Sequence, residues 1–264
     1  MNKPLYLRPE EIHPVYEGYP GPYMIGFEHL KRIFPRWEDP HLTEQIGQIR
    51  GRDRLSYWGM MDPDEANILI GIVRATQPAT IFEIGTGYGV LTKYLAEATS
   101  PNCTVHTLDI LPSKIDTAKF TVDACNKTYV PPGDDEIGKA YKNVGLEGRI
   151  MQHYGDSAIF DFSPFNGKID VVIVDANHGY EAAQNDLGKA LEIVSPGGVV
   201  VVDDFDKMHH LAGVVYAVLT EIAENGRIFY HVYNHAINAN PSYGPQSHVV
   251  FHPNIPEAIR KNGG

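Results

Sequence analysis

Acidic residues end two apolar, strand-like segments in the second half of the chain. Asp175 closes KIDVVIVD (168–175), and Asp203 and Asp204 close GVVVVDD (198–204). The carboxyl ends of parallel strands open into one crevice, so these acids are expected to be neighbours. Crowded carboxylates repel one another, and a divalent cation relieves that repulsion. The pattern predicts an all-oxygen site for Mg²⁺ or another divalent cation, held by Asp175, Asp203 and Asp204, without histidine or thiolate ligands. Helix capping alone accounts for one of these acids.

A histidine follows the first of these acids. His178 lies three residues beyond Asp175, in the segment that leaves the strand. An imidazole with an ordinary pKa near ~6.5 is largely neutral at pH 7 and can accept a proton. We therefore predict that His178 is a general base acting beside Asp175. The alternative is an outer position in which His178 is hydrogen-bonded to an acid.

A glycine-rich turn follows an earlier strand-like segment, TIFEIG (80–85). The turn reads E-I-G-T-G-Y-G over residues 83–89, and a helix is predicted directly after it. Glycines at such a turn let backbone amides approach a ligand. The spacing is GxGxG, unlike the GxGxxG of dinucleotide sites, and Glu83 is expected to repel pyrophosphate and suit a cationic ligand. Asp109, which ends TVHTLD (104–109), is placed to accept hydrogen bonds from both hydroxyls of a ribose.

The elements that would position these residues alternate between strands and helices. Strands are predicted at 80–85, 104–109, 149–156, 168–175 and 198–204. A helix is predicted to start at Asp62-Pro63, and further helices at roughly 89–99, 112–127, 180–194 and 207–225. This alternation predicts an α/β fold with a doubly wound, mostly parallel sheet covered by helices on both faces. Two last strands, at 228–233 and 247–252, have no helix between them and should pair antiparallel.

The amino-acid composition of the chain changes near residue 62. Residues 1–61 are rich in aromatic residues and proline, so we expect an extension that packs on the core, as a structural wrap or as the wall of a pocket. Residues 62–264 would form the domain itself. The irregular, polar stretch 129–143 is an insertion before the third strand. It is expected to be a lid over the substrate or a surface excursion.

Charge and hydropathy exclude several classes of protein. The 264 residues include 22 Lys+Arg and 33 Asp+Glu, for a formal net charge of −11. That balance argues against a protein that binds nucleic acid without sequence preference. The sequence has no apolar run long enough to span a membrane, and its N-terminus does not resemble a signal peptide. Two cysteines are too few for a disulfide framework, so we expect a cytoplasmic protein with reduced thiols.

These motifs resemble those of class I S-adenosylmethionine-dependent methyltransferases, which have a Rossmann-like, seven-stranded sheet. E-I-G-T-G-Y-G matches their first motif, and Asp109 matches the acid that holds the cofactor ribose. Asp175, Asp203, Asp204 and the stretch D-x-x-H-x-Y-E further resemble the metal-dependent O-methyltransferases of the catechol and caffeoyl-coenzyme A type and their bacterial relatives. In the catechol type a lysine base stands where this sequence has His178. The resemblance implies that the cofactor contacts Glu83, Gly85, Thr86, Gly87, Gly89, Asp109, Asp156, Ser157 and Asp175.

The resemblance implies methyl transfer to a hydroxyl of a small molecule, with S-adenosylmethionine as cofactor. Two alternatives stay open. One is a metal-independent methyltransferase acting on nitrogen, carbon or a carboxylate, and the other is a non-catalytic protein that keeps the cofactor site. An NAD-dependent oxidoreductase is disfavoured by the GxGxG spacing and by Glu83. If the chain assembles, a homodimer is the expected form.

Overall fold

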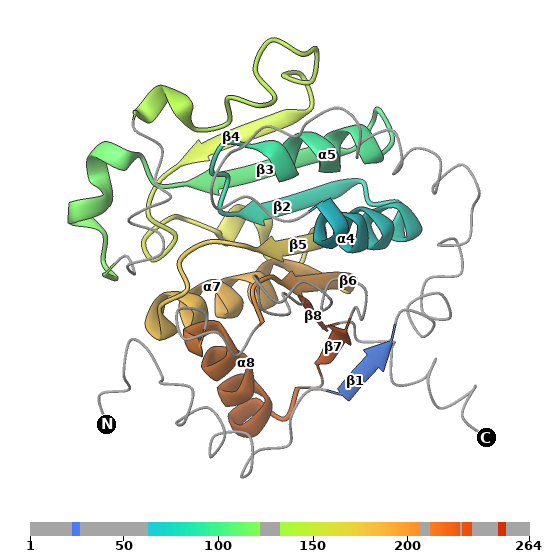
Figure 1. Cartoon of the computed structure of the whole chain (residues 1–264), viewed down its shortest axis with the longest axis vertical. Helices are drawn as coiled ribbons and strands as arrows, with labels where there is room; N and C mark the ends of the chain where they lie inside the picture. Colours follow the sequence, from blue (N-terminus) through green and yellow to red (C-terminus); the bar gives the residue numbers. More distant parts are fainter. Residues whose placement is uncertain are drawn as a thin grey trace.

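An eight-stranded sheet lies at the centre of the computed structural model, which describes residues 23–26, 63–121, 133–205, 212–227, 229–233 and 248–251. The strand order is β1-β7-β8-β6-β5-β2-β3-β4 (Figure 1). The strands are β1 (Tyr23–Gly26), β2 (Thr80–Ile84), β3 (Thr104–Asp109), β4 (Ile150–Tyr154), β5 (Ile169–Val174), β6 (Val194–Val202), β7 (Tyr230–Tyr233) and β8 (His248–Phe251). Neighbouring strands are parallel except where β8 pairs with β6 and β7. The predicted mostly parallel sheet with an antiparallel C-terminal strand is confirmed.

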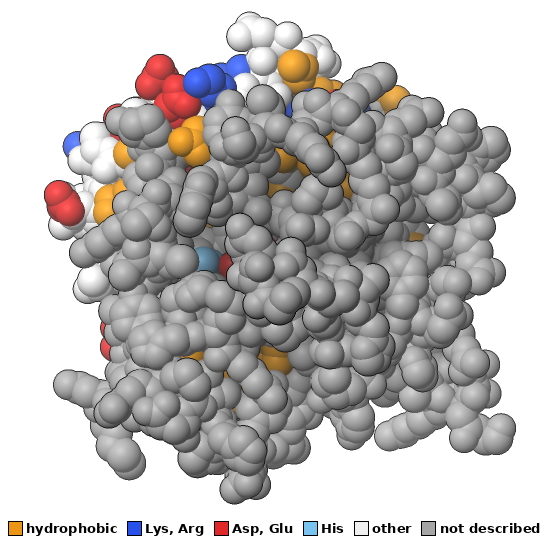
Figure 2. Space-filling view, in the orientation of Figure 1, with side chains coloured by type: hydrophobic (Ala, Val, Ile, Leu, Met, Phe, Trp, Pro, Cys, Tyr) orange, Lys and Arg blue, Asp and Glu red, His pale blue; other side chains and the backbone are white. Residues whose placement is uncertain are grey.

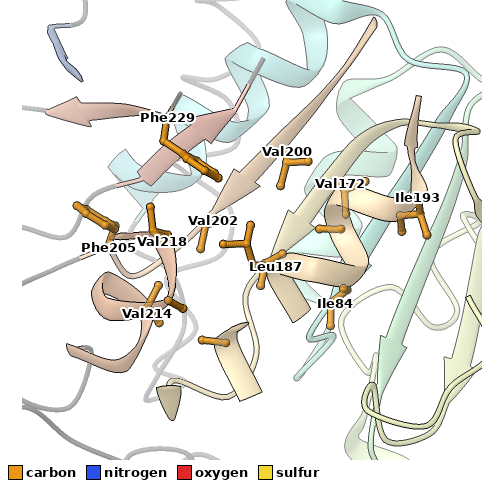
Figure 3. Close-up of a cluster of buried hydrophobic side chains, with 14 of the residues drawn as sticks. Ile84, Val172, Leu187, Ile193, Val200, Val202, Phe205, Val214, Val218 and Phe229 are labelled. Carbon is orange, nitrogen blue, oxygen red and sulfur yellow. The ribbon is translucent and has the colours of Figure 1, made fainter. Parts of the chain in front are cut away.

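Among the described residues, four helices cover the two faces of this sheet, namely α4 (Pro63–Thr76), α5 (Val90–Ala98), α7 (Tyr180–Ile193) and α8 (Ala212–Asn225). Side chains of a strand alternate between faces. In β5, Val171 and Ile173 pack in the cluster that includes α4 and α5 residues. Val172 and Val174 pack in the other, which holds residues of α7 and α8 (Figure 3). The doubly wound arrangement is therefore confirmed by the packing.

An eighth strand comes from the N-terminal extension. Residues 23–26 form β1, which pairs in parallel with β7. Pro20 and Pro22 precede this four-residue strand, and the sequence pattern did not predict it. The rest of residues 1–61 lies outside the described residues, so the packing role predicted for the extension stays a prediction.

The helix predicted over 112–127 is wrong in its described part. Residues Pro112–Thr117 form a short 3-10 helix, η2, and Ala118 is already extended. Backbone groups after η2 bond to other segments. The Lys119 amide donates to Asp156 Oδ2 at 2.8 Å, and the Thr121 carbonyl accepts from Asn177 Nδ2 at 3.0 Å. Groups used in this way cannot also close α-helical turns.

Two further features bear on the sequence predictions. None of the helices among the described residues is long and apolar enough to cross a membrane. In the predicted insertion, residues 129–132 lie outside the described residues. Residues 133–149 form a series of turns that includes the 3-10 helix η3 (Asp134–Glu136).

Candidate active site

The glycine turn leaves β2 against the end of β5. Gly85 has φ +107°, and a Cβ at this position would overlap the carbonyl oxygen of Asp175. The Gly85 amide donates to Leu108 O at 2.9 Å, and the Asp175 amide donates to Ile84 O at 2.9 Å. Only glycine combines this backbone conformation with so close an approach. The turn is thus held between the ends of β3 and β5.

Asp109 holds the glycine turn from the end of β3. Its Oδ2 accepts hydrogen bonds from the amides of Gly87 at 2.7 Å and Thr86 at 3.1 Å. Burial raises the pKa of Asp109 to about 6, although hydrogen bonds from the Gly87, Ile110 and Thr86 amides act in the opposite direction. Sequence reasoning did not identify this anchoring role. The predicted contact with a ribose stays a prediction.

Glu83 is buried beneath the turn. Its side chain has no exposed surface, and its Oε2 accepts hydrogen bonds from Thr92 at 2.5 Å and Thr107 at 2.6 Å. Burial raises the pKa of Glu83 to about 8, and the two threonine hydrogen bonds offset only part of this effect. The group is therefore mostly neutral at pH 7. A neutral carboxyl group repels pyrophosphate less than a carboxylate does, so the predicted effect of Glu83 on pyrophosphate would be weakened.

A histidine and two aspartates converge at the carboxyl ends of β5 and β6. Asp175, His178 and Asp204 each offer a ligand atom, and these atoms all lie within 4.8 Å of one another. His178 Nε2 is 2.8 Å from Asp204 Oδ2. Burial raises the pKa of Asp175 well above its usual range. The negative charges of Asp203 and Asp204 raise it further, and His178 opposes them. A cation in this cluster would relieve the repulsion.

Asp203 differs from the other predicted metal ligands. Its amide donates to Val174 O at 2.9 Å, which continues the β5–β6 pairing, and its side chain is 6% exposed. Asp204 follows with φ +56°, and its carboxylate reaches His178. The cluster thus contains two of the three predicted ligands, Asp175 and Asp204. His178 is the third member of this cluster, and the all-oxygen site of Asp175, Asp203 and Asp204 stays a prediction.

Asp156 and Ser157 brace the turn after β4. Asp156 Oδ1 accepts from the Ala158 amide at 2.9 Å, while its Oδ2 accepts from Lys119. Ser157 forms a hydrogen bond with the carboxyl group of Asp186 on α7. Burial raises the pKa of Asp186 to about 6. These contacts fix the loop beside Asp109. The predicted cofactor contacts of Asp156 and Ser157 stay predictions.

Three further residues near the site carried no signal in the sequence. Asn177 bonds the Thr121 carbonyl through Nδ2, and its Oδ1 accepts from the Gly179 amide at 3.0 Å, which shapes the segment holding His178. The hydroxyl of Tyr141 donates to Gln152 Oε1, and Gln152 Nε2 donates to Thr86 Oγ1 at 3.1 Å. The contacts of Asn177 with Thr121 and of Gln152 with Thr86 join segments that are distant in the sequence, so no local pattern reports them.

Comparison with known proteins agrees with this arrangement. Residues 82–205 match a family model described as a methyltransferase domain. Among similar solved structures is the O-methyltransferase TomG from Streptomyces achromogenes, involved in tomaymycin synthesis and solved with SAM. It has a TM-score of 0.52 and 20% identity, over 81% of this chain and 90% of TomG. An O-methyltransferase from Bacillus cereus, solved with SAH, has a TM-score of 0.52 and 17% identity, over 80% and 90%. The chain has no significant match among curated proteins.

Proposed function

We propose that this protein is an S-adenosylmethionine-dependent O-methyltransferase that acts on a hydroxyl of a small molecule with the help of a divalent cation. One observation carries the proposal, namely that Asp175 contacts both the glycine turn and the cluster of converging side chains. Its carbonyl oxygen lies against Gly85 of the glycine turn, and its carboxylate lies with His178 and Asp204. A cofactor at the turn and an acceptor at the cluster would therefore be neighbours.

The residues around the turn fit the cofactor. Gly85, Gly87 and Gly89 all have positive φ and place no side chain at three of the five positions of the turn, and Asp109 fixes two of its amides. These residues would hold the adenosine and methionine parts. The solved structures with SAM and SAH support the same cofactor here. When bound, S-adenosylmethionine supplies an activated methyl group on its sulfonium. The protein contributes alignment, which in well-oriented systems reaches effective molarities of ~10⁵ M or more.

The cluster fits a divalent cation, held by Asp175, His178 and Asp204. A bound cation would supply Lewis-acid chemistry, lowering the pKa of the acceptor hydroxyl. Two oxygens and one imidazole nitrogen suit metals such as Mn²⁺ or Zn²⁺ at least as well as Mg²⁺, which prefers oxygen ligands. We propose Mg²⁺ or a related divalent ion, and metal-titration experiments distinguish them.

His178 is the proton acceptor in the form of this proposal in which Asp175 and Asp204 hold the cation without it, because a ring nitrogen bound to a metal cannot accept a proton. Its Nε2 faces the Asp204 carboxylate at 2.8 Å, so an imidazolium formed by proton transfer would be stabilised by a neighbouring negative charge. The same contact favours a second candidate, a metal-independent methyltransferase in which the His178–Asp204 pair alone removes the proton. A carboxylate that orients an imidazole is a common arrangement for a general base.

A methyl-transfer assay tests the proposal. The protein is incubated with isotopically labelled S-adenosylmethionine and a panel of hydroxylated aromatic and sugar acceptors, with and without EDTA. We expect label in an acceptor hydroxyl, loss of activity in EDTA, and recovery with Mg²⁺ or Mn²⁺. Activity that is unchanged by EDTA would select the metal-independent candidate. Binding of NAD without binding of S-adenosylhomocysteine would contradict the cofactor proposal.

Three further features belong to the proposal. We propose a cytoplasmic protein that works as a homodimer if it assembles, without a nucleic-acid partner, on the basis of its acidic composition and its small-molecule chemistry. A non-catalytic role would be supported by cofactor binding without turnover of any acceptor in the panel.

A further inference from the structure

Residues 133–142, which precede β4, lie directly on the glycine turn, although about fifty residues separate the two segments in the sequence. We propose that this segment is a clamp on the turn and that Tyr141 and Gln152 are positioning residues that set the affinity for the cofactor. The inference rests on the proposed function, because it concerns the same cofactor site. It also assigns the segment a role other than the predicted lid over the substrate.

Two backbone hydrogen bonds attach the clamp to the turn. The Gly138 amide donates to Gly87 O at 3.0 Å, and the Ala140 amide donates to Tyr88 O at 2.9 Å. Both acceptors lie in the part of the turn whose amides Asp109 holds from the other side. The turn is therefore fixed on two sides, by a carboxylate and by a second backbone segment.

A series of side-chain hydrogen bonds connects the clamp to the sheet. Tyr141 donates to Gln152, and Gln152 donates to Thr86 Oγ1. Thr86 Oγ1 and Thr107 Oγ1 are 2.6 Å apart and share a hydrogen bond, and Thr107 Oγ1 is in turn hydrogen-bonded to Glu83 Oε2. Burial raises the pKa of Tyr141, so its hydroxyl stays protonated and remains a donor.

Steric contacts show how closely the clamp fits. A Cβ at Gly89 would lie 2.7 Å from ring carbons of Tyr141 and 2.8 Å from Gly138 Cα. A Cβ at Gly138 would overlap the Tyr141 hydroxyl. The two glycines leave room for the tyrosine ring between turn and clamp. A single added methyl group is enough to displace it.

The clamp has one buried and one exposed side, which argues against a surface excursion. Ile137 is 1% exposed and Tyr141 is 5% exposed. The exposed side carries charge, including an ion pair of 2.9 Å between Lys139 and Glu136. Acidic and basic side chains lie side by side along the upper edge of Figure 2, where Figure 1 places this part of the chain. Because the buried side of the segment contacts the glycine turn, the segment can hold the turn in place.

Two glycine variants test the clamp with a matched control. Gly138 has φ +68° and Gly145 has φ +83°, so alanine is strained by its backbone at either position. Only at Gly138 does the added Cβ meet Tyr141, since nothing lies within 4 Å of a Cβ at Gly145. We expect Gly138→Ala to raise the Kd for S-adenosylhomocysteine about tenfold or more relative to Gly145→Ala, as measured by calorimetry.

Tyr141→Phe provides a second variant that keeps the ring and removes one donor. We expect it to raise the Kd for S-adenosylhomocysteine and the KM for S-adenosylmethionine about five- to tenfold, with little change in Tm, kcat or acceptor KM. Hydrogen exchange of residues 86–89 should be faster in this variant than in wild type. If Gly138→Ala fails to fold, the hydrogen-exchange measurement on Tyr141→Phe decides whether the clamp holds the turn.

The outcomes separate the two proposals. Wild-type protein that does not bind S-adenosylhomocysteine contradicts the proposed function. Wild-type protein that binds it, while Tyr141→Phe keeps wild-type affinity and wild-type exchange at 86–89, overturns the clamp alone. Equal affinities for Gly138→Ala and Gly145→Ala also overturn it. A larger change in acceptor KM than in cofactor KM would return the segment to the role of a substrate lid.

Discussion

Nε2 of His178 lies 2.8 Å from Oδ2 of Asp204, which joins the end of β5 to the end of β6 through two side chains. Asp204 reaches this position with φ +56°, an uncommon conformation for a residue other than glycine. Sparsely populated conformations of this kind gather at functional sites. The pair is the most direct structural support for a base in the proposed reaction.

Removing the imidazole should affect chemistry more than binding. For His178→Ala we expect kcat to fall about 10²–10⁴-fold while the Kd for S-adenosylhomocysteine is unchanged, because His178 lies in the cluster at which we propose that the acceptor binds. Asp204→Asn should give a smaller loss, since it keeps the side-chain shape and removes only the charge. Initial rates between about pH 6 and 9, a range around the ordinary imidazole pKa, provide the measurement. Near-normal kcat for His178→Ala would assign proton removal to another group.

Asp109→Ala should weaken cofactor binding by about 1.5–3 kcal/mol, because two amides of the turn lose a charged acceptor. Asp161→Ala is the matched control, since its exposed carboxylate also accepts from a backbone amide, that of Ser163, away from the turn. Calorimetry with S-adenosylhomocysteine distinguishes the two. Equal affinities for the two variants would show that Asp109 does not organise the turn.

The two acids after β6 should differ in their effect on metal binding. Asp204 belongs to the cluster of converging ligand atoms and Asp203 does not, so Asp204→Asn should reduce Mn²⁺ affinity more than Asp203→Asn. Both substitutions keep the size of the side chain. Titration of Mn²⁺ in the presence of S-adenosylhomocysteine measures the affinities. A larger effect for Asp203→Asn would restore the ligand set predicted from the sequence.

Glu83 should make the fold less stable as pH rises. Its pKa is about 8 in the folded protein against 4.5 ordinarily, so between these values the folded state binds a proton that the unfolded state has released. The free energy of unfolding therefore falls with rising pH in this window, with a slope approaching about 1.4 kcal/mol per pH unit. Glu83→Gln, a neutral mimic, should remove this contribution. Denaturant unfolding of both proteins at pH 5 to 8 tests it, and parallel curves would count against a protonated Glu83.

The strands and the site acids were predictable because their signals are local. Val171, Val172, Ile173 and Val174 form a continuous apolar run, which is typical of a parallel strand buried on both faces. The acid that follows such a run necessarily lies at the carboxyl edge. The convergence of Asp175 and Asp204 could therefore be inferred without coordinates.

The remaining features depend on contacts between distant segments. The segment after Pro112 has helix-compatible residues, yet its backbone bonds to Asp156 and Asn177. The neutrality of Glu83 comes from complete burial under a turn that only the folded sheet creates. The clamp depends on Tyr141 meeting Gly89, and no pattern within the insertion indicates that partner. Tertiary context decides each of these cases.

The pairing of β1 with β7 has a consequence for the order of folding. Residues 23–26 find their hydrogen-bond partners at residues 230–233, roughly two hundred positions later in the chain. β7 is in turn held by β8, which joins it to β6. During synthesis β1 cannot form this pairing until residues 230–233 have emerged from the ribosome. Contacts with such long sequence separation form slowly, so this edge of the sheet should be the last part to assemble.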